Sequence, residues 1–70
     1  MMEVLSSMAG TVFQLLVSKG DTVEKGQIVI ILESMKMEIP IESEHSGIVQ
    51  EIYVTEGDFV NEAERLLKLV

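Results

Sequence analysis

Hydrophobic residues recur along this chain at every second position more often than at the three- and four-residue spacing of an amphipathic helix. Apolar runs rich in Val, Ile and Leu alternate with polar breaks that contain glycine, which is the pattern of short β-strands joined by turns. The run over 28–32 has five apolar residues in succession and predicts a strand buried on both faces. We expect strands or single strand positions at 12–17, 23, 28–32, 39–41, 48–54, 59–60 and 66–70.

The polar breaks predict tight turns. Glycine permits a positive φ in such turns, and an aspartate side chain can accept hydrogen bonds from backbone N–H groups of the same turn. The turns are expected at Lys19-Gly20-Asp21, Lys25-Gly26-Gln27, His45-Ser46-Gly47 and Glu56-Gly57-Asp58.

The chain contains the same pattern twice. A shift of 37 residues aligns the segment 9–32 with the segment 46–69. The shift pairs identical residues, namely Gly10 with Gly47, Val12 with Val49, Val17 with Val54, Gly20 with Gly57, Asp21 with Asp58, Val23 with Val60 and Leu32 with Leu69. Two copies are too few for a solenoid, so the repeat predicts one closed fold made of two related halves.

Two segments contain residues that do not fit the simple pattern of strands and turns. Pro40 has no N–H to donate, so the strand over 39–41 should lie at the edge of a sheet or leave that position unpaired. The segment 61–68 contains good helix formers, and Asn61 could cap a helix. Its counterpart in the first copy contains Gly26 and leads into a strand, so we predict a turn followed by a strand here as well.

Short strands separated by turns indicate an all-β barrel or sandwich. The repeat predicts two similar sheets that face each other, because neither half alone could bury its apolar face. In the second copy we expect Phe59 and Val60 to pack in the core. Seventy residues are enough for one small domain, which we expect to span 1–70.

The composition narrows the function classes. Twelve Asp or Glu residues against five Lys or Arg give a net charge of −7, which repels phosphate backbones and argues against nucleic-acid binding. No stretch has the length of a membrane span, and the N-terminus has no signal-peptide pattern. The chain has no cysteine, which is compatible with a reducing cytoplasm.

Lys36 lies at the joint of the two copies, between Met35 and Met37. The joint should be a hairpin tip, where a lysine is usually a solvated charge. Two large apolar neighbours are costly at an exposed turn. Either the methionines fold back onto the barrel, or they form a recognition surface, for which the adaptable methionine side chain is suited.

These residues resemble a known family. Glu33-Ser34-Met35-Lys36-Met37, with Gly-Asp-x-Val motifs before and after it, is similar to the biotinyl domain of biotin-dependent carboxylases. The resemblance covers nearly the whole chain and is closest to the small stand-alone biotin/lipoyl attachment proteins. Only seven residues separate Val12 from Gly20, so the chain looks like a carrier without the thumb of the bacterial acetyl-CoA carboxylase subunit.

The resemblance implies a flattened β-barrel of two four-stranded antiparallel sheets with quasi-two-fold symmetry, a barrel-sandwich hybrid. It implies that a biotin protein ligase attaches biotin covalently to Lys36 on a hairpin turn. Met35 and Met37 would serve that turn, and Glu33 and Ser34 would flank the recognised site. The carrier itself would be a monomeric, cytoplasmic non-enzyme that moves a carboxyl group between a biotin carboxylase and a carboxyltransferase.

Two departures keep an alternative open. Ser34 stands where the biotinyl family commonly has Ala, and Glu33-Ser34 also resembles lipoyl domains, so a lipoyl ligase could attach lipoate for a 2-oxo acid dehydrogenase type complex. Ser7 stands where family members often have Pro. An unmodified structural barrel-sandwich module is a further alternative, and Met35-Lys36-Met37 argues against it.

Other candidate sites have less support. His45 is the only histidine and has no cysteine with which to share a metal, so we interpret it as a turn residue and expect no metal site. Ser6, Ser7, His45 and Asp58 lack any nucleophile motif, and a barrel of this size has no room for a substrate cleft. Glu38, Glu42 and Glu44 are interpreted as a solvated acidic face.

Overall fold

Eight short β-strands form the protein, whose computed structural model describes residues 2–70. No helix occurs within these residues. The strands are β1 (Met2–Leu5), β2 (Gly10–Leu15), β3 (Thr22–Val23), β4 (Ile28–Ser34), β5 (Met37–Glu42), β6 (Gly47–Ile52), β7 (Phe59–Val60) and β8 (Arg65–Leu69).

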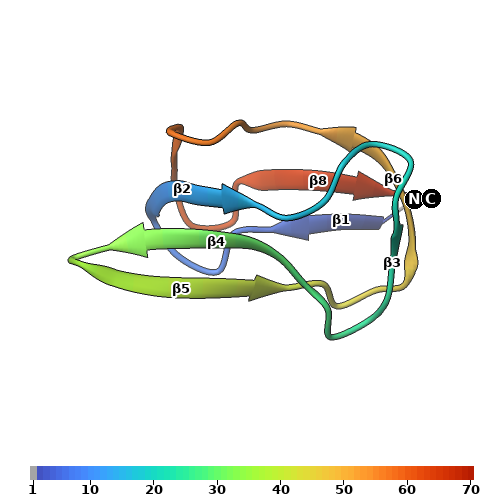
Figure 1. The fold of residues 1–70 in the computed structure, drawn as a ribbon, viewed down its shortest axis with the longest axis horizontal. Helices are drawn as coiled ribbons and strands as arrows, with labels where there is room; N and C mark the ends of the chain where they lie inside the picture. The colour runs from blue at the N-terminus through green and yellow to red at the C-terminus, as the bar shows by residue number, and fades with distance from the viewer. Residues whose placement is uncertain (1) are drawn as a thin grey trace.

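The strands form two four-stranded sheets, with the orders β1-β8-β6-β3 and β5-β4-β2-β7. All the strand pairs are antiparallel. The two sheets lie against each other in an elongated molecule measuring 32 × 19 × 18 Å (Figure 1). The all-β class and the flattened barrel of two sheets are therefore confirmed.

The quasi-two-fold symmetry extends to the strand register. Thr22 and Val23 of β3 pair with Ile48 and Gly47 of β6. The same shift of 37 residues gives the pairing of β7 with β2, in which Phe59 faces Thr11 and Val60 faces Gly10. The backbone hydrogen bonds that close the barrel repeat in the same way, from Gly20 N to Val49 O and from Gly57 N to Val12 O, both at 2.8 Å.

Each sheet combines strands from both halves. In one sheet the inner strands β8 and β6 come from the second half, and the outer strands β1 and β3 come from the first. The other sheet has inner strands β4 and β2 from the first half and outer strands β5 and β7 from the second. The halves are therefore interlocked, and neither sheet is complete without both.

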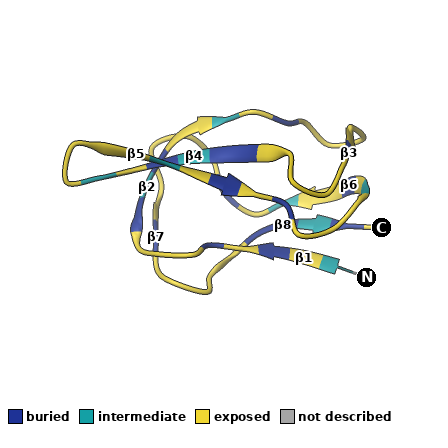
Figure 2. Cartoon of the chain, turned by 90° about the horizontal axis from the view of Figure 1, so that it is seen from below, coloured by how far each residue is buried: buried dark blue, intermediate teal, exposed yellow. Residues whose placement is uncertain are grey.

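The core lies between the sheets (Figure 2). It consists almost entirely of valine, leucine and isoleucine, which suit a pleated buried surface. The buried apolar side chains are Val4, Val12, Val17, Val23, Val29, Ile30, Leu32, Ile41, Val49, Val54, Val60, Leu66, Leu67 and Leu69.

Several local predictions are confirmed. The strand with Pro40 is at an edge, since β5 is the outer strand of its sheet. The segment that begins at Asn61 forms a turn followed by β8 and no helix. The aspartates stabilise their turns as expected, because Asp21 Oδ2 accepts a hydrogen bond from Ser18 N at 2.8 Å and Asp58 Oδ2 accepts one from Thr55 N at 3.0 Å.

Three predictions need correction. Phe59 does not pack in the core, because it is 63% exposed on the short outer strand β7. The run over 28–32 is not buried throughout, since Ile28 is exposed and Ile31 is half-buried. Strand β1 was not foreseen, although the shift of 37 residues aligns Met2–Leu5 with the end of β5.

Ala63 departs from the symmetry in a way that affects stability. It has a φ of 67°, and its counterpart in the first half, Gly26, has a φ of 90°. Their backbone N–H groups donate equivalent hydrogen bonds, from Gly26 to Ser43 O and from Ala63 to Ser6 O. An L-residue with a side chain is strained in this left-handed region, whereas glycine is not.

We predict that Ala63→Gly stabilises the protein by about 0.5–1 kcal/mol and that Gly26→Ala destabilises it by about 1 kcal/mol. A Cβ at Gly26 would have no neighbour within 4 Å, so backbone strain alone should set the effect. Thermal and urea unfolding of the two variants measures both values. A loss of stability in Ala63→Gly would show that the turn is not strained.

Candidate functional site

Lys36 lies at the tip of the hairpin between β4 and β5. Ser34 pairs with Met37, which leaves a loop of two residues, Met35 and Lys36. Their φ angles are 52° and 65°. Two consecutive positive φ angles are the mark of a type I′ turn, whose twist matches that of the flanking strands. The hairpin therefore stays paired to its end, and the turn that contains Lys36 joins β4 and β5. The β4–β5 hairpin reaches the extreme tip of the molecule (Figure 1).

The residue types at this turn are unusual. Type I′ turns favour Asn-Gly, because asparagine and glycine tolerate positive φ. Methionine and lysine in the left-handed region cost about 1–2 kcal/mol each. Such strain persists where the surrounding structure imposes it and is concentrated at functional sites.

The methionines beside Lys36 are exposed. Met35 is 91% exposed and Met37 is 65% exposed, so neither folds back onto the barrel. Two adaptable apolar side chains thus flank the amine in solvent, an arrangement that fits a surface recognised by other proteins. Ser34 is half-buried on the preceding strand.

The charges near the tip are acidic. Glu33 and Glu38 are directly opposite each other in the register of β4 and β5, and both are exposed. Like charges in such a pair are destabilising. Two salt bridges occur among residues 2–70, Lys19–Glu51 and Arg65–Glu3, and neither includes Lys36. The amine is therefore not held by an ion pair within the described part of the chain.

The chain ends lie at the end of the molecule opposite the β4–β5 hairpin tip (Figure 1). The two-fold symmetry relates the two ends of the barrel. Near the hairpin Leu32 pairs with Ile39, and near the termini the equivalent residues Leu69 and Met2 pair in the same way. The Leu69–Met2 pair at the terminal end therefore corresponds to the Leu32–Ile39 pair near the hairpin.

A hollow of about 400 Å³ lies beside the hairpin tip. Its lining comes from the hairpin tip, from the start of β2 with the residue before it, and from Phe59 of β7. The lining residues are Ala9, Gly10, Thr11, Glu33, Ser34, Met35, Lys36 and Phe59. Phe59 was not predicted to be part of this site. Its counterpart in the repeat is the polar, exposed Thr22, and that was a signal that the position faces solvent.

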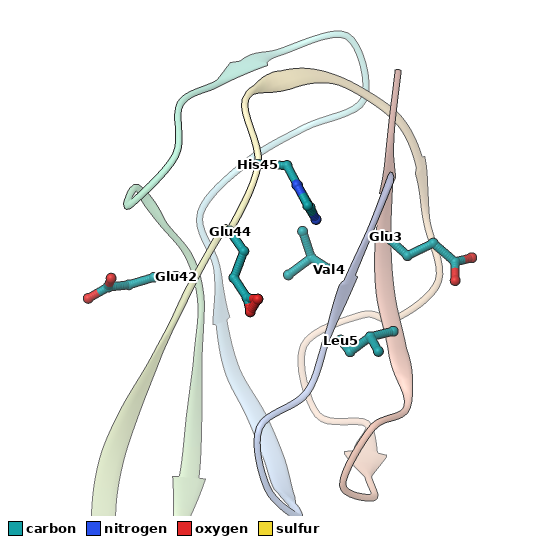
Figure 3. A pocket seen from close by; sticks show the side chains of 6 residues that line it. All are labelled: Glu3, Val4, Leu5, Glu42, Glu44 and His45. Atoms are coloured by element: carbon teal, nitrogen blue, oxygen red, sulfur yellow. The ribbon is translucent and has the colours of Figure 1, made fainter. Parts of the chain in front are cut away.

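The other candidate residues lie elsewhere. His45, Glu42 and Glu44 line a separate hollow of about 220 Å³ next to β1. The carboxylates of Glu3 and Glu42 point in opposite directions there (Figure 3). Glu38 and Glu42 are four residues apart on β5, and within residues 2–70 no group of three or more His, Cys, Asp or Glu side chains is placed to hold a metal ion.

The family model described as "Biotin-requiring enzyme" matches residues 2–69. The chain belongs to the biotin/lipoyl attachment family. Within residues 2–70 of this attachment domain, no helix is long and apolar enough to cross a membrane.

Similar proteins come from both branches of the family. The domain is 57% identical over 68 residues to a biotin/lipoyl attachment protein of Bacillus subtilis (strain 168), covering 97% of this chain and 93% of that protein. It is 39% identical over 51 residues to a dihydrolipoyllysine-residue succinyltransferase component of the 2-oxoglutarate dehydrogenase complex from Staphylococcus saprophyticus, covering 73% of this chain and 12% of that protein.

The fold is also found in a solved carboxylase. The crystal structure of Kluyveromyces lactis urea carboxylase contains a region that matches 99% of this chain with a TM-score of 0.90 and 32% identity. The domain spans only 6% of that carboxylase chain.

The turn geometry generates a stability prediction. Met35→Asn should stabilise the domain by about 0.5–1 kcal/mol, because asparagine tolerates the positive φ better than methionine. Met37→Asn is the matched control, since Met37 is in a strand and its φ is not positive. Urea unfolding of both variants should show a gain for the first and no gain for the second. Equal effects would mean that the turn stores no strain.

Proposed function

We propose that this domain is a non-catalytic carrier that holds biotin covalently on Lys36. It would move a carboxyl group from a biotin carboxylase to a carboxyltransferase. The observation that carries the proposal is the placement of Lys36 at an exposed, strained hairpin tip between two exposed methionines. An unmodified structural module has no use for this arrangement.

The attachment chemistry requires little of the domain. The free-base Nζ of Lys36 attacks the acyl carbon of biotin that a ligase has activated with ATP. An amide bond forms, the adenylate leaves, and the ligase accepts the proton from the amine. The domain needs only to present the amine, and the type I′ turn does so at an exposed position.

The attached group would carry the carboxyl group, and the domain would supply effective concentration. A tethered group meets two enzyme sites by local motion, which replaces diffusional encounters. The tip is suited to this role because it projects beyond the other loops at its end of the barrel (Figure 1). An enzyme site can then receive the tip without contacting the core.

Recognition by the ligase would use the residues around Lys36. Met35 and Met37 offer apolar contacts, and Glu33 and Glu38 offer negative charge to a basic enzyme surface. Ser34 lies at the end of β4, between Glu33 and Met35. A net charge of −7 would speed association with such a surface.

We further propose that the domain acts as a monomer in the cytoplasm. Three of its four edge strands are poor templates for pairing, because β3 and β7 have two residues each and β5 contains Pro40. The negative charge opposes self-association. The cytoplasm supplies the ATP that ligation and carboxylation consume.

Lipoate is the second candidate for the same lysine. Glu33-Ser34 matches the lipoyl pattern, and the similarity to the succinyltransferase component supports it. A lipoyl ligase and a 2-oxo acid dehydrogenase type complex would then be the partners. Met35 and Met37 favour biotin.

The first test locates the modification. Incubation with biotin, ATP and a biotin protein ligase should label Lys36, as read by peptide mass. Lys36→Arg should reduce labelling to background, while Lys25→Arg, at an exposed turn on another loop, should label at the wild-type rate. Labelling of Lys36→Arg at the wild-type rate would exclude Lys36 as the acceptor.

The second test concerns the choice of cofactor. We expect the wild type to prefer biotin in a competition between a biotin ligase and a lipoyl ligase. The double variant Met35→Asp, Met37→Ala rebuilds the lipoyl core on the same hairpin and should shift the ratio about tenfold toward lipoate, equivalent to about 1.4 kcal/mol. Intact mass measures the ratio. Wild type that accepts lipoate alone would refute the biotin proposal, and an unchanged ratio in the variant would remove the methionines from the choice.

A further inference from the structure

Phe59 is a large aromatic side chain that the fold does not require. It is 63% exposed on a strand of two residues. The same strand position in the other half, Thr22, is polar and exposed, and β3 pairs in the same register as β7. The same strand pairing therefore forms with threonine at the equivalent position, so the pairing does not require an aromatic ring.

The strand pairing places Phe59 in a row that leads to the lysine hairpin. Phe59 faces Thr11, and Thr11 faces Glu33 on the other side. Directly paired residues point to the same face of a sheet. With a strand spacing of about 4.8 Å, Phe59 and Glu33 are about 10 Å apart across the row. All three line the same hollow as Lys36.

The hollow thus offers two kinds of contact next to the modified residue. Phe59 supplies an apolar aromatic face. Thr11 supplies a hydroxyl, and Glu33 supplies carboxylate oxygens that accept hydrogen bonds. A ligand that fits has one apolar ring and one polar edge with N–H donors, which is the composition of the fused head group of biotin.

We propose that this hollow is a resting site for the head group carried by Lys36, with Phe59 as its apolar platform. The inference rests on the proposed biotin attachment. The ureido N–H groups would donate to Glu33 and Thr11, and the sulfur-containing ring would lie toward Phe59. Lys36 itself lines the hollow, so the arm reaches it by folding back.

Weak affinity is sufficient for such a site. A tether of this kind gives an effective concentration of the order of millimolar. A head group with an intrinsic dissociation constant of about 1 mM would then occupy the hollow about half of the time. The arm would be shielded between enzymes and still free to leave when a partner binds.

The experiment compares biotinylated wild type with Phe59→Thr, which installs the residue found in the other half. Phe13→Thr is the matched control, because Phe13 is 44% exposed on β2 and does not line the hollow. Intact mass first verifies one biotinyl group on each protein. NMR then measures nuclear Overhauser contacts between the head group and the Phe59 ring, and stopped flow measures the rate of streptavidin capture.

We expect contacts to the Phe59 ring in the wild type and in Phe13→Thr. Phe59→Thr should capture streptavidin about twofold faster, because the head group is no longer occluded half of the time. Phe59→Tyr should restore the slower rate. An amide spectrum of each variant checks that the fold is retained, and the wild-type contacts decide the question if a variant fails to fold.

Three other outcomes would refute the resting site. Wild type that accepts no biotin would refute the proposed function and this site with it. Biotinylated wild type without contacts to Phe59 and with the same capture rate as Phe59→Thr would refute the resting site alone. If Phe59→Thr instead lowers kcat/KM for the ligase while contacts and capture are unchanged, Phe59 is a partner contact, and the resting site is again refuted.

Discussion

The structure depends on the exchange of outer strands between two related halves. Each sheet takes its inner pair from one half and its edge strands from the other, so burial of the valine and leucine core requires both halves at once. A chain of this size has little surplus stability, and a core shared by every element is an efficient use of its apolar residues. The exchange also directs the β4–β5 hairpin to one end of the barrel and both termini to the other.

Strain is concentrated at the hairpin tip. The other turns are relaxed by glycines and by aspartates that accept backbone hydrogen bonds, with Ala63 as an exception. At the tip, Met35 and Lys36 adopt positive φ angles, and Glu33 faces Glu38 across the strands. The core lies away from the tip, so a few kcal/mol of local cost can be tolerated there without disturbing the barrel.

The residues that break the symmetry coincide with the proposed site. Glycines, aspartates and buried valines are repeated in both halves because both need the same turns and the same core. Lys36 lies outside both aligned segments, 9–32 and 46–69, at the joint between them. Phe59 replaces the equivalent of Thr22 at an exposed position beside that lysine. The repeated residues thus form the scaffold, and the residues of the proposed site lie at one end of it.

The sequence by itself determined the local structure and the location of the lysine. Alternating apolar residues and Gly-Asp turns specify strands and turns through neighbours in the chain, and the repeat placed Lys36 at a joint. Only the tertiary structure decided which strands pair, that β1 completes a sheet, and that Met35, Met37 and Phe59 are exposed. The physical reason is that long-range pairing is selected by burial across two sheets, to which segments distant in the sequence contribute. Phe59 is apolar and precedes the buried Val60, so the sequence alone predicts that it is in the core. Its exposure follows only from the position of the opposing sheet.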